Sequence, residues 1–160
     1  MVATDLYLRG ASSLIFALSG GMKSTGAMNA QLGAFGYPTW FAQVLGVGEV
    51  ALAAANVGPE LAPLLGFSAA PFVAGNVWVQ RAFALIMGGA TAQHLVAGDN
   101  GFVVPLVLLA LSAAVPALRG DAASPAEAAG VAAALAAAGY GVVHLIARKP
   151  AAAPAASKTK

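Results

Sequence analysis

The chain has 160 residues, of which 59% are hydrophobic and only 9% are charged. An average soluble domain has about 25% charged residues, so this composition cannot cover the surface of a water-soluble globule and is typical of a membrane protein. The chain has no cysteine, which excludes disulfides, thiolate metal sites and thiol nucleophiles. Its net charge is +2, without the dense basic runs interleaved with aromatic residues that nucleic-acid-binding surfaces show, so we expect no nucleic-acid partner.

Five apolar stretches come close to the ~20 residues that a membrane-spanning helix needs. Turn-forming Gly, Pro, Asn and Asp residues separate them, and "GDNG" between the third and the fourth is so short that these two must be antiparallel neighbours. We therefore predict an all-α, multi-pass transmembrane helix bundle embedded in the lipid bilayer. The stretches cover residues 6–22, 40–57, 72–96, 102–118 and 126–147.

The fifth stretch consists mostly of alanine, which favours helix formation but contributes little free energy of transfer into hydrocarbon. It can cross the membrane, lie in the interface or pack on the other four helices. We favour crossing, because Tyr140 and a basic end suit a membrane boundary. "SPAE" predicts the start of this helix, with Ser124 as N-cap, Pro125 at the first position and Glu127 at the third.

The chain divides into a four-helix bundle at 1–121, an additional Ala-rich helix at 122–149 and a disordered basic tail at 150–160. If five helices cross, Lys23 and the basic tail lie on one side, which predicts a cytoplasmic C-terminus and an external N-terminus. If the fifth does not cross, both ends are expected in the cytoplasm. Asp5, ahead of the first stretch, argues against its being a cleaved signal peptide.

One carboxylate, Glu49 in "QVLGVGEVALAAANVG", lies in the middle of the second stretch. At ~1.5 Å per helical residue it lies about 13 Å from either end, close to the membrane midplane. A charge there costs about 2.5–3.5 kcal/mol on insertion scales, so Glu49 must be paired, protonated or turned inward. We prefer Arg81 as its partner, because Arg81 lies at a similar level in the third stretch. Lys23, which enters from the opposite boundary, is the second choice.

A polar pair, Gln93 and His94, lies near the end of the third stretch on the same side as Lys23. Structural interpretations compete with functional ones here: Glu49 with Arg81 can fix helix register, Lys23 can snorkel, and His94 can be an interface histidine. Neither histidine of the chain has an evident local carboxylate partner, so we expect no metal site. The candidate buried polar site comprises Glu49, Arg81, Lys23, His94 and Gln93.

Five short motifs occur in a particular order: "FALSGGMKSTG", "FGYPTW", "LGVGEVALA", "MGGATAQHLVAGD" and "VVPLVLLAL". Over about residues 10–118 this pattern resembles the DoxX-like family of small four-helix membrane proteins. The resemblance implies a compact four-helix bundle whose motif Lys, Glu and His correspond to Lys23, Glu49 and His94. Members of the family are associated with membrane oxidoreductase assemblies, including a quinone-linked thiosulfate-oxidising subunit, and distant eukaryotic relatives look like assembly chaperones for ion-channel receptors.

The sequence contains no catalytic motif, which favours a non-enzymatic function. Our first hypothesis is an assembly factor, chaperone or accessory subunit that docks other membrane proteins or a second copy of itself. The alternative is a quinone- or proton-handling accessory subunit of a membrane oxidoreductase complex, with no cofactor of its own and an electron carrier on the partner. A third hypothesis, a small transporter, is disfavoured because the chain shows no inverted repeat.

Overall fold

The computed structural model describes residues 3–147, and this part of the chain is helical, without strands. The predicted all-α class is confirmed, whereas the tail predicted at 150–160 lies outside the described residues. Five long helices correspond to the five apolar stretches, and their ends differ from the predicted ones by at most three residues. They are α1 (Ala3–Ser24), α3 (Thr39–Asn56), α5 (Ala70–Ala97), α6 (Val103–Arg119) and α7 (Pro125–Ile146).

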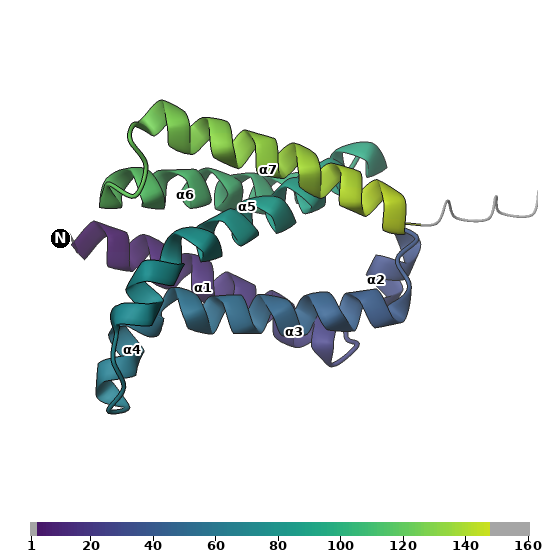
Figure 1. Ribbon diagram of the computed structural model, residues 1–160. Coiled ribbons are helices and arrows are strands. Elements are labelled where there is room, and N and C mark those ends of the chain that lie inside the picture. The colour runs from purple at the N-terminus through teal and green to yellow at the C-terminus, as the bar shows by residue number, and fades with distance from the viewer. Residues whose placement is uncertain (1–2, 148–160) are drawn as a thin grey trace, which may run out of the picture.

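Short helices occupy the links between the long ones. α2 (Asn29–Ala34) precedes α3, α4 (Gly58–Leu64) follows it, and the 3-10 helix η1 (Asn100–Phe102) leads into α6. α4 is bent by 70° from α3, and in Figure 1 it projects away from the bundle. Pro59 lies in its first turn, where the missing N–H of proline costs no helical hydrogen bond.

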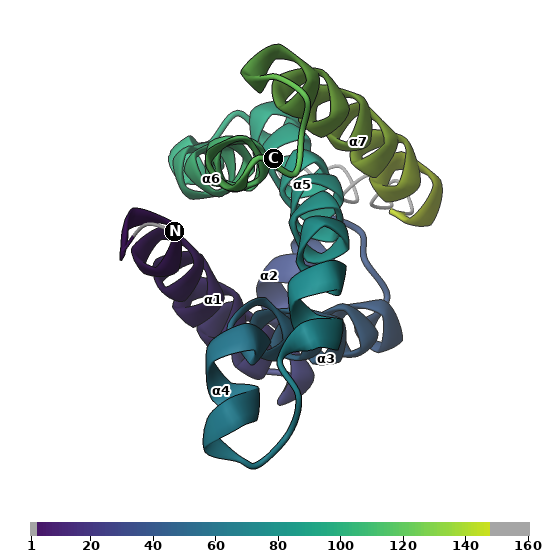
Figure 2. The same ribbon diagram turned by 60° about the vertical axis from the view of Figure 1, so that its left-hand side comes forward.

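Two groups of helices meet along α5. α1 packs along α3 on one side, while α6 and α7 pack on each other and on α5 on the other side (Figures 1 and 2). At the centre Phe16 of α1 stacks on Phe83 of α5 with ring centroids 3.8 Å apart. The core continues through buried side chains of α3, α5 and α6, namely Ala53, Val79, Met87 and Leu108.

Glycines allow α1 and α3 to approach closely. A Cβ atom on Gly46 would lie 2.5 Å from the backbone nitrogen of Ser24 and 2.6 Å from the carbonyl oxygen of Gly20, closer than real Cβ atoms come. α1 therefore ends beside the eighth residue of α3, and the first two turns of α3 continue beyond it, where α2 contacts α3. This stagger decides which residues of the two helices meet.

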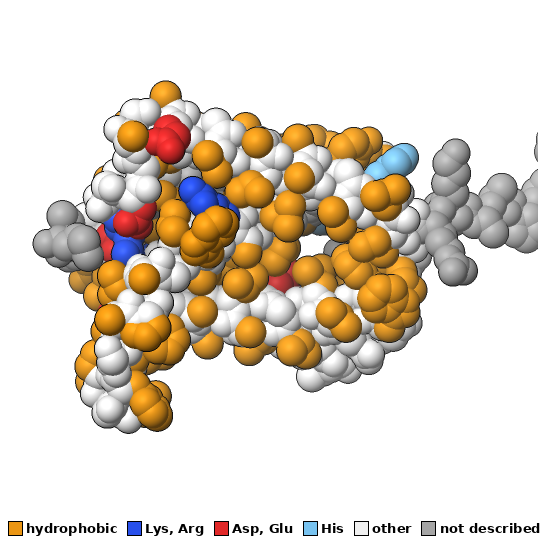
Figure 3. All heavy atoms as spheres, in the orientation of Figure 1, with side chains coloured by type: hydrophobic (Ala, Val, Ile, Leu, Met, Phe, Trp, Pro, Cys, Tyr) orange, Lys and Arg blue, Asp and Glu red, His pale blue; other side chains and the backbone are white. Residues whose placement is uncertain are grey.

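Within residues 3–147, two helical segments are long and apolar enough to cross a membrane: α7, and the segment Asn100–Arg119 that joins η1 to α6. α3 with α4 would make a third if the bent pair is counted as one span. α1 and α5 carry buried polar side chains, which lower their hydropathy, and their crossing of the membrane stays a prediction, as does the orientation of the termini. Apolar side chains cover most of the face seen in Figure 3.

The predicted start of α7 is confirmed. Ser124 Oγ accepts a hydrogen bond from the Glu127 N–H at 3.1 Å, and Glu127 Oε2 accepts one from the Ala123 N–H at 2.6 Å. Pro125 occupies the first position, and Glu127 reaches back to the residue before the N-cap, so both side chains satisfy backbone N–H groups at the helix start. α7 packs against α5 and α6; its crossing of the membrane remains a prediction.

Candidate functional site

Glu49 forms an ion pair with Lys23 in the interior of the bundle. Lys23 Nζ lies 2.5 Å from Glu49 Oε1 and donates a second hydrogen bond to Ser19 Oγ at 2.9 Å. Glu49 has no exposed surface, and Lys23 is 8% exposed. Because Ser19 precedes Lys23 by four residues, both side chains lie on the face of α1 that meets α3.

The preferred pairing of Glu49 with Arg81 is wrong, and the second choice, Lys23, is right. The residue before Arg81 in α5, Gln80, is the one that faces the interior, with 1% of its surface exposed. Successive residues of a helix are rotated by about 100° about its axis, so the Arg81 side chain points in a different direction from that of Gln80. Its guanidinium lies 4.5 Å from the ring centroid of Trp78. The prediction compared only the depths of Glu49 and Arg81 along the membrane normal. The partner of Glu49 also depends on the rotation of Arg81 about the axis of α5 and on the stagger of α1 against α3.

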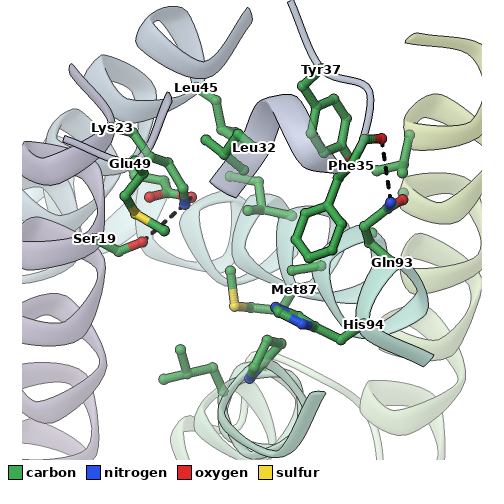
Figure 4. A pocket seen from close by; sticks show the side chains of 18 of the residues that line it. Ser19, Lys23, Leu32, Phe35, Tyr37, Leu45, Glu49, Met87, Gln93 and His94 are labelled. Carbon is green, nitrogen blue, oxygen red and sulfur yellow. Dashed lines mark hydrogen bonds and ion pairs between the residues drawn. The ribbon is translucent and has the colours of Figure 1, made fainter. Parts of the chain in front are cut away.

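A pocket of about 300 Å³ opens beside the ion pair. In Figure 4, Glu49 and Lys23 lie on one side and Gln93 and His94 on another. Four of the five predicted site residues therefore line one pocket, whereas Arg81 does not. The wall between them is mainly apolar and includes Ile15, Leu32, Phe41, Ile86, Met87 and Leu108.

One oxygen of the buried carboxylate has no partner. Glu49 Oε1 faces Lys23, but no hydrogen bond from residues 3–147 reaches Oε2, which is itself buried. A buried polar atom without a partner costs about 1–3 kcal/mol, and nearly all such atoms in proteins find one. Glu49 also lines the pocket, so Oε2 is an acceptor that a ligand or a bound water can use.

At the other side of the pocket His94 is held by Asp99, a carboxylate that was not among the predicted site residues. His94 Nδ1 lies 2.7 Å from Asp99 Oδ1, which corrects the expectation that this histidine has no local partner. The ring of Phe35 packs edge-on against the imidazole with centroids 5.3 Å apart. Gln93 Nε2 reaches the carbonyl oxygen of Phe35 at 3.5 Å, so both polar side chains contact the residue that ends α2.

Three further polar residues of the pocket, Ser19, Gln31 and Tyr37, were not predicted. Ser19 gives a weak signal in the sequence, since it lies four residues before Lys23 on the same helix face. Tyr37 lies in the link between α2 and α3, and only the fold brings it to the pocket. Burial raises the pKa of Tyr37 to about 12, so its phenol stays protonated at neutral pH and can donate a hydrogen bond.

A second buried polar group lies at the other end of α1. Arg9 donates to Asp5 Oδ2 at 3.1 Å, to Glu60 Oε2 at 3.0 Å and to the carbonyl oxygen of Asn56 at 2.7 Å. The spacing of Asp5 and Arg9 is that of a helical ion pair and is visible in the sequence. Glu60 comes from α4, so the bend after α3 is needed to complete the contact.

Asn56 extends this group to α5. Its Nδ2 donates to Ser13 Oγ at 3.0 Å, and its Oδ1 accepts from Gln80 Nε2 at 2.7 Å and from Asn76 Nδ2 at 3.1 Å. Asn76 Oδ1 is buried and has no partner among the described residues. The pocket that Gln80 lines is only about 30 Å³. We call this set the Arg9 cluster: Asp5, Arg9, Ser13, Asn56, Glu60, Asn76 and Gln80.

The larger pocket offers hydrogen bonding and proton exchange. Glu49 and His94 can exchange protons, and the ammonium of Lys23 can donate. No group of three or more His, Cys, Asp or Glu side chains within the described part of the chain is placed to hold a metal ion. The residues present therefore suit a mainly apolar ligand that carries hydrogen-bonding atoms near its ends.

The model of the DoxX-like family matches residues 7–115 of the chain. This protein belongs to the DoxX-like family. The matched part runs from α1 into α6 and contains Lys23, Glu49, Gln93 and His94, so the resemblance inferred from the sequence motifs is confirmed. Comparisons with curated proteins and with solved structures give no match.

In this DoxX-like protein, α7 adds one wall of the pocket from outside the matched residues. Gly139, Val142 and Val143 of α7 line it. The contact is close: a Cβ atom on Gly89 of α5 would lie 2.7 Å from Val143 Cγ2. Figure 3 shows a hollow between α3 and α7 on the visible face, so the pocket lies between the family core and its additional helix.

Proposed function

We propose that this DoxX-like protein is an accessory subunit of a membrane oxidoreductase assembly, and that its pocket holds the headgroup of a quinone-class ligand. The observation that carries the proposal is the unpartnered Oε2 of Glu49 inside a pocket of about 300 Å³. A hydroxyl of a hydroquinone can donate to this oxygen, and a quinone carbonyl can accept from Lys23.

The lining of the pocket supports a ring-shaped ligand. Ligand sites are usually apolar cavities of about 300–1,000 Å³ with a few polar groups that fix orientation, and this pocket lies at the small end of that range. Phe35, Phe41 and Met87 can pack on the faces of one aromatic ring. The polar groups near Glu49 and near His94 would then meet the oxygens of the ring.

The balance of electrons and protons sets the proposed roles of this chain and of its partner subunit. Oxidation of a hydroquinone to a quinone breaks two O–H bonds and releases two protons and two electrons. Glu49 and His94 are groups that can take up protons inside a membrane. The two electrons go to a flavin, haem or iron–sulfur carrier on the partner subunit, so this chain binds the ring and handles protons.

Binding can be measured directly with the full chain in phosphatidylcholine nanodiscs. We expect saturable binding of a short-chain benzoquinone or its hydroquinone. Glu49→Gln should weaken binding of the hydroquinone about tenfold or more, because a charged acceptor is lost. Glu127→Gln makes the same chemical change at the exposed start of α7 and should bind like the wild type.

A second variant keeps the test valid if Glu49→Gln fails to fold. Ala90 lines the pocket and takes no part in the ion pair, so Ala90→Phe should fill the cavity while Lys23 and Glu49 stay paired. Loss of binding in this variant, with normal thermal stability, is the expected result. A wild-type protein that binds neither redox form contradicts the proposal.

Docking of other membrane proteins, without a ligand, is the second candidate function. The observation in its favour is the exposure of large apolar side chains at the end of α4 and just after it. Leu64 is 81%, Leu65 is 70% and Phe67 is 68% exposed. Crosslinking and affinity isolation from the native membrane should recover a partner, and Leu64→Gln with Leu65→Gln should reduce its recovery. Isolation of this chain alone counts against both docking and the accessory role.

A further inference from the structure

A tight turn after α5 brings Asp99 back to His94. Gly98 ends α5 in the left-handed conformation with φ of 71°, which glycine adopts without a steric penalty. Asp99 Oδ1 then accepts a hydrogen bond from the Gly101 N–H at 2.7 Å and faces His94 Nδ1 at the same distance. A Cβ atom on Gly101 would collide with the imidazole, so glycine at this position lets the ring lie against the turn.

Asp99 decides which nitrogen of the ring carries the proton. The Gly101 N–H and His94 lower the pKa of Asp99, so this carboxylate is ionised at neutral pH and only accepts hydrogen bonds. The proton of neutral His94 must then be on Nδ1, which leaves a lone pair on Nε2. No hydrogen bond from the described residues reaches Nε2, and His94 lines the pocket.

Side-chain exposure decreases from Asp99 through His94 to Glu49. The side chain of Asp99 is 46% exposed, that of His94 is 18% exposed and that of Glu49 is fully buried. The other titratable groups that line the pocket are Lys23 and Tyr37, and neither has a hydrogen bond with His94. Asp99 is thus the one charged residue of the described chain that fixes this imidazole.

We propose that Asp99 is a positioning residue that holds His94 with its Nε2 lone pair toward the pocket, so that the pocket prefers a ligand with a hydroxyl at this end. This inference rests on the proposed function and names its ligand more closely. A hydroquinone has donors at both ends of the ring and can meet the two acceptors, Glu49 Oε2 and His94 Nε2. The oxidised quinone has only acceptors and would face a lone pair at His94.

The first measurement needs no ligand. Nitrogen-15 NMR of the histidine rings in the full chain should show Nδ1 protonated and Nε2 bare in His94, with His144→Gln used to assign the two residues. His144 is exposed near the end of α7, so this substitution leaves the pocket intact. Asp99→Ala should abolish the strong preference for one tautomer, because free imidazole populates both forms. A proton on Nε2 in the wild type overturns the inference.

The second measurement compares the two redox forms of one short-chain benzoquinone in nanodiscs under argon. The wild type should bind the hydroquinone about tenfold more tightly than the quinone, the effect of one well-placed hydrogen bond. Asp99→Ala should lose most of this preference and keep quinone binding. Asp121→Ala, in the exposed link after α6, is the matched control and should preserve the preference.

The two measurements separate this inference from the proposed function. Equal binding of both redox forms by the wild type overturns the preference for the hydroxyl and leaves the quinone-class ligand standing. Absence of binding of either form contradicts the proposed function together with the ligand named here, even if the NMR shows the expected tautomer. Asp99→Ala with unchanged redox preference removes Asp99 from its positioning role.

Discussion

The two ends of α1 bury charge in two different ways. At one end, Arg9 meets two carboxylates and a backbone carbonyl, and the amide of Asn56 carries the contacts on to α5. At the other end, Lys23 and Glu49 have each other and Ser19, and a pocket of about 300 Å³ lies beside them. The stacked rings of Phe16 and Phe83 belong to the apolar core that lies between α1 and α5.

The surroundings of a buried charge mark it as a candidate site, and its burial does not. Burial alone does not distinguish the two ends, because Arg9 is 2% exposed and Glu49 is 0% exposed. What differs is the space around the charges and the partners that they have. The polar groups of the Arg9 cluster bond with one another across four helices, which is typical of a structural network, and its unpartnered acceptor, Asn76 Oδ1, belongs to a residue that lines neither of the two pockets described above. The unpartnered acceptor of Glu49, in contrast, belongs to a residue that lines the larger pocket.

The two largest effects that we expect come from breaking the two groups of buried charges, and the first of these groups is the Arg9 cluster. Arg9→Met removes a donor to three acceptors and leaves Asp5 buried without its partner, which should lower the free energy of unfolding by about 3–5 kcal/mol. Unfolding by titration with a denaturing detergent measures this loss. Arg119→Met removes a single ion pair whose carboxylate, Asp121, is 29% exposed, so water can reach the group left behind and the loss should be clearly smaller than for Arg9→Met. Equal stability of the two variants would mean that the Arg9 cluster is not structural.

The second effect concerns the Lys23 and Glu49 pair. Lys23→Met alone leaves a buried carboxylate without a partner and should cost about 3–5 kcal/mol. The double variant Lys23→Met with Glu49→Leu should regain most of this stability, since buried pairs can be replaced by apolar side chains at little cost. It should also lose ligand binding completely.

A parallel double variant at the other end of α1 tests whether the two groups of charges differ. Arg9→Met with Asp5→Leu should regain little stability, because Glu60 still lacks its donor and the carbonyl oxygen of Asn56 keeps only the longer hydrogen bond from Asn76 Nδ2 at 3.2 Å. If this double variant recovers as fully as the one at Lys23, the two ends of α1 do not differ in the way proposed here.

The helices could be predicted from the sequence because each long helix coincides with an apolar run bounded by turn residues. The start of α7 could be predicted for a similar local reason, since Ser124 and Glu127 form their cap within four residues. Local hydrogen bonding and hydropathy depend only on residues that are close together in the sequence. That is why the fold class and the family were both recognised correctly.

The contacts between helices could be predicted only in part. Glu49 was identified as a buried charge, yet its partner depended on the stagger that Gly20 and Gly46 permit, and the sequence pattern does not reveal which glycines touch. Asn56 carries no charge and was not distinguished from its apolar neighbours, although it is central to the Arg9 cluster. Residues of α2 and α7 also line the pocket, so no single sequence motif predicts it.

The smallest of the expected effects tests that stagger. Gly46→Ala places a Cβ atom 2.5 Å from the backbone nitrogen of Ser24, and such overpacking should cost about 1–3 kcal/mol. Gly48 lies on the same helix with nothing within 4 Å of its Cβ position, so Gly48→Ala should be neutral or stabilising by about 1 kcal/mol. Because α1 must shift to admit the methyl group on Gly46, Lys23 should move relative to Glu49 and ligand binding should weaken. Weakened binding in Gly46→Ala but not in Gly48→Ala would tie the site to the close approach of α1 and α3, whereas equal behaviour of the two variants would separate them.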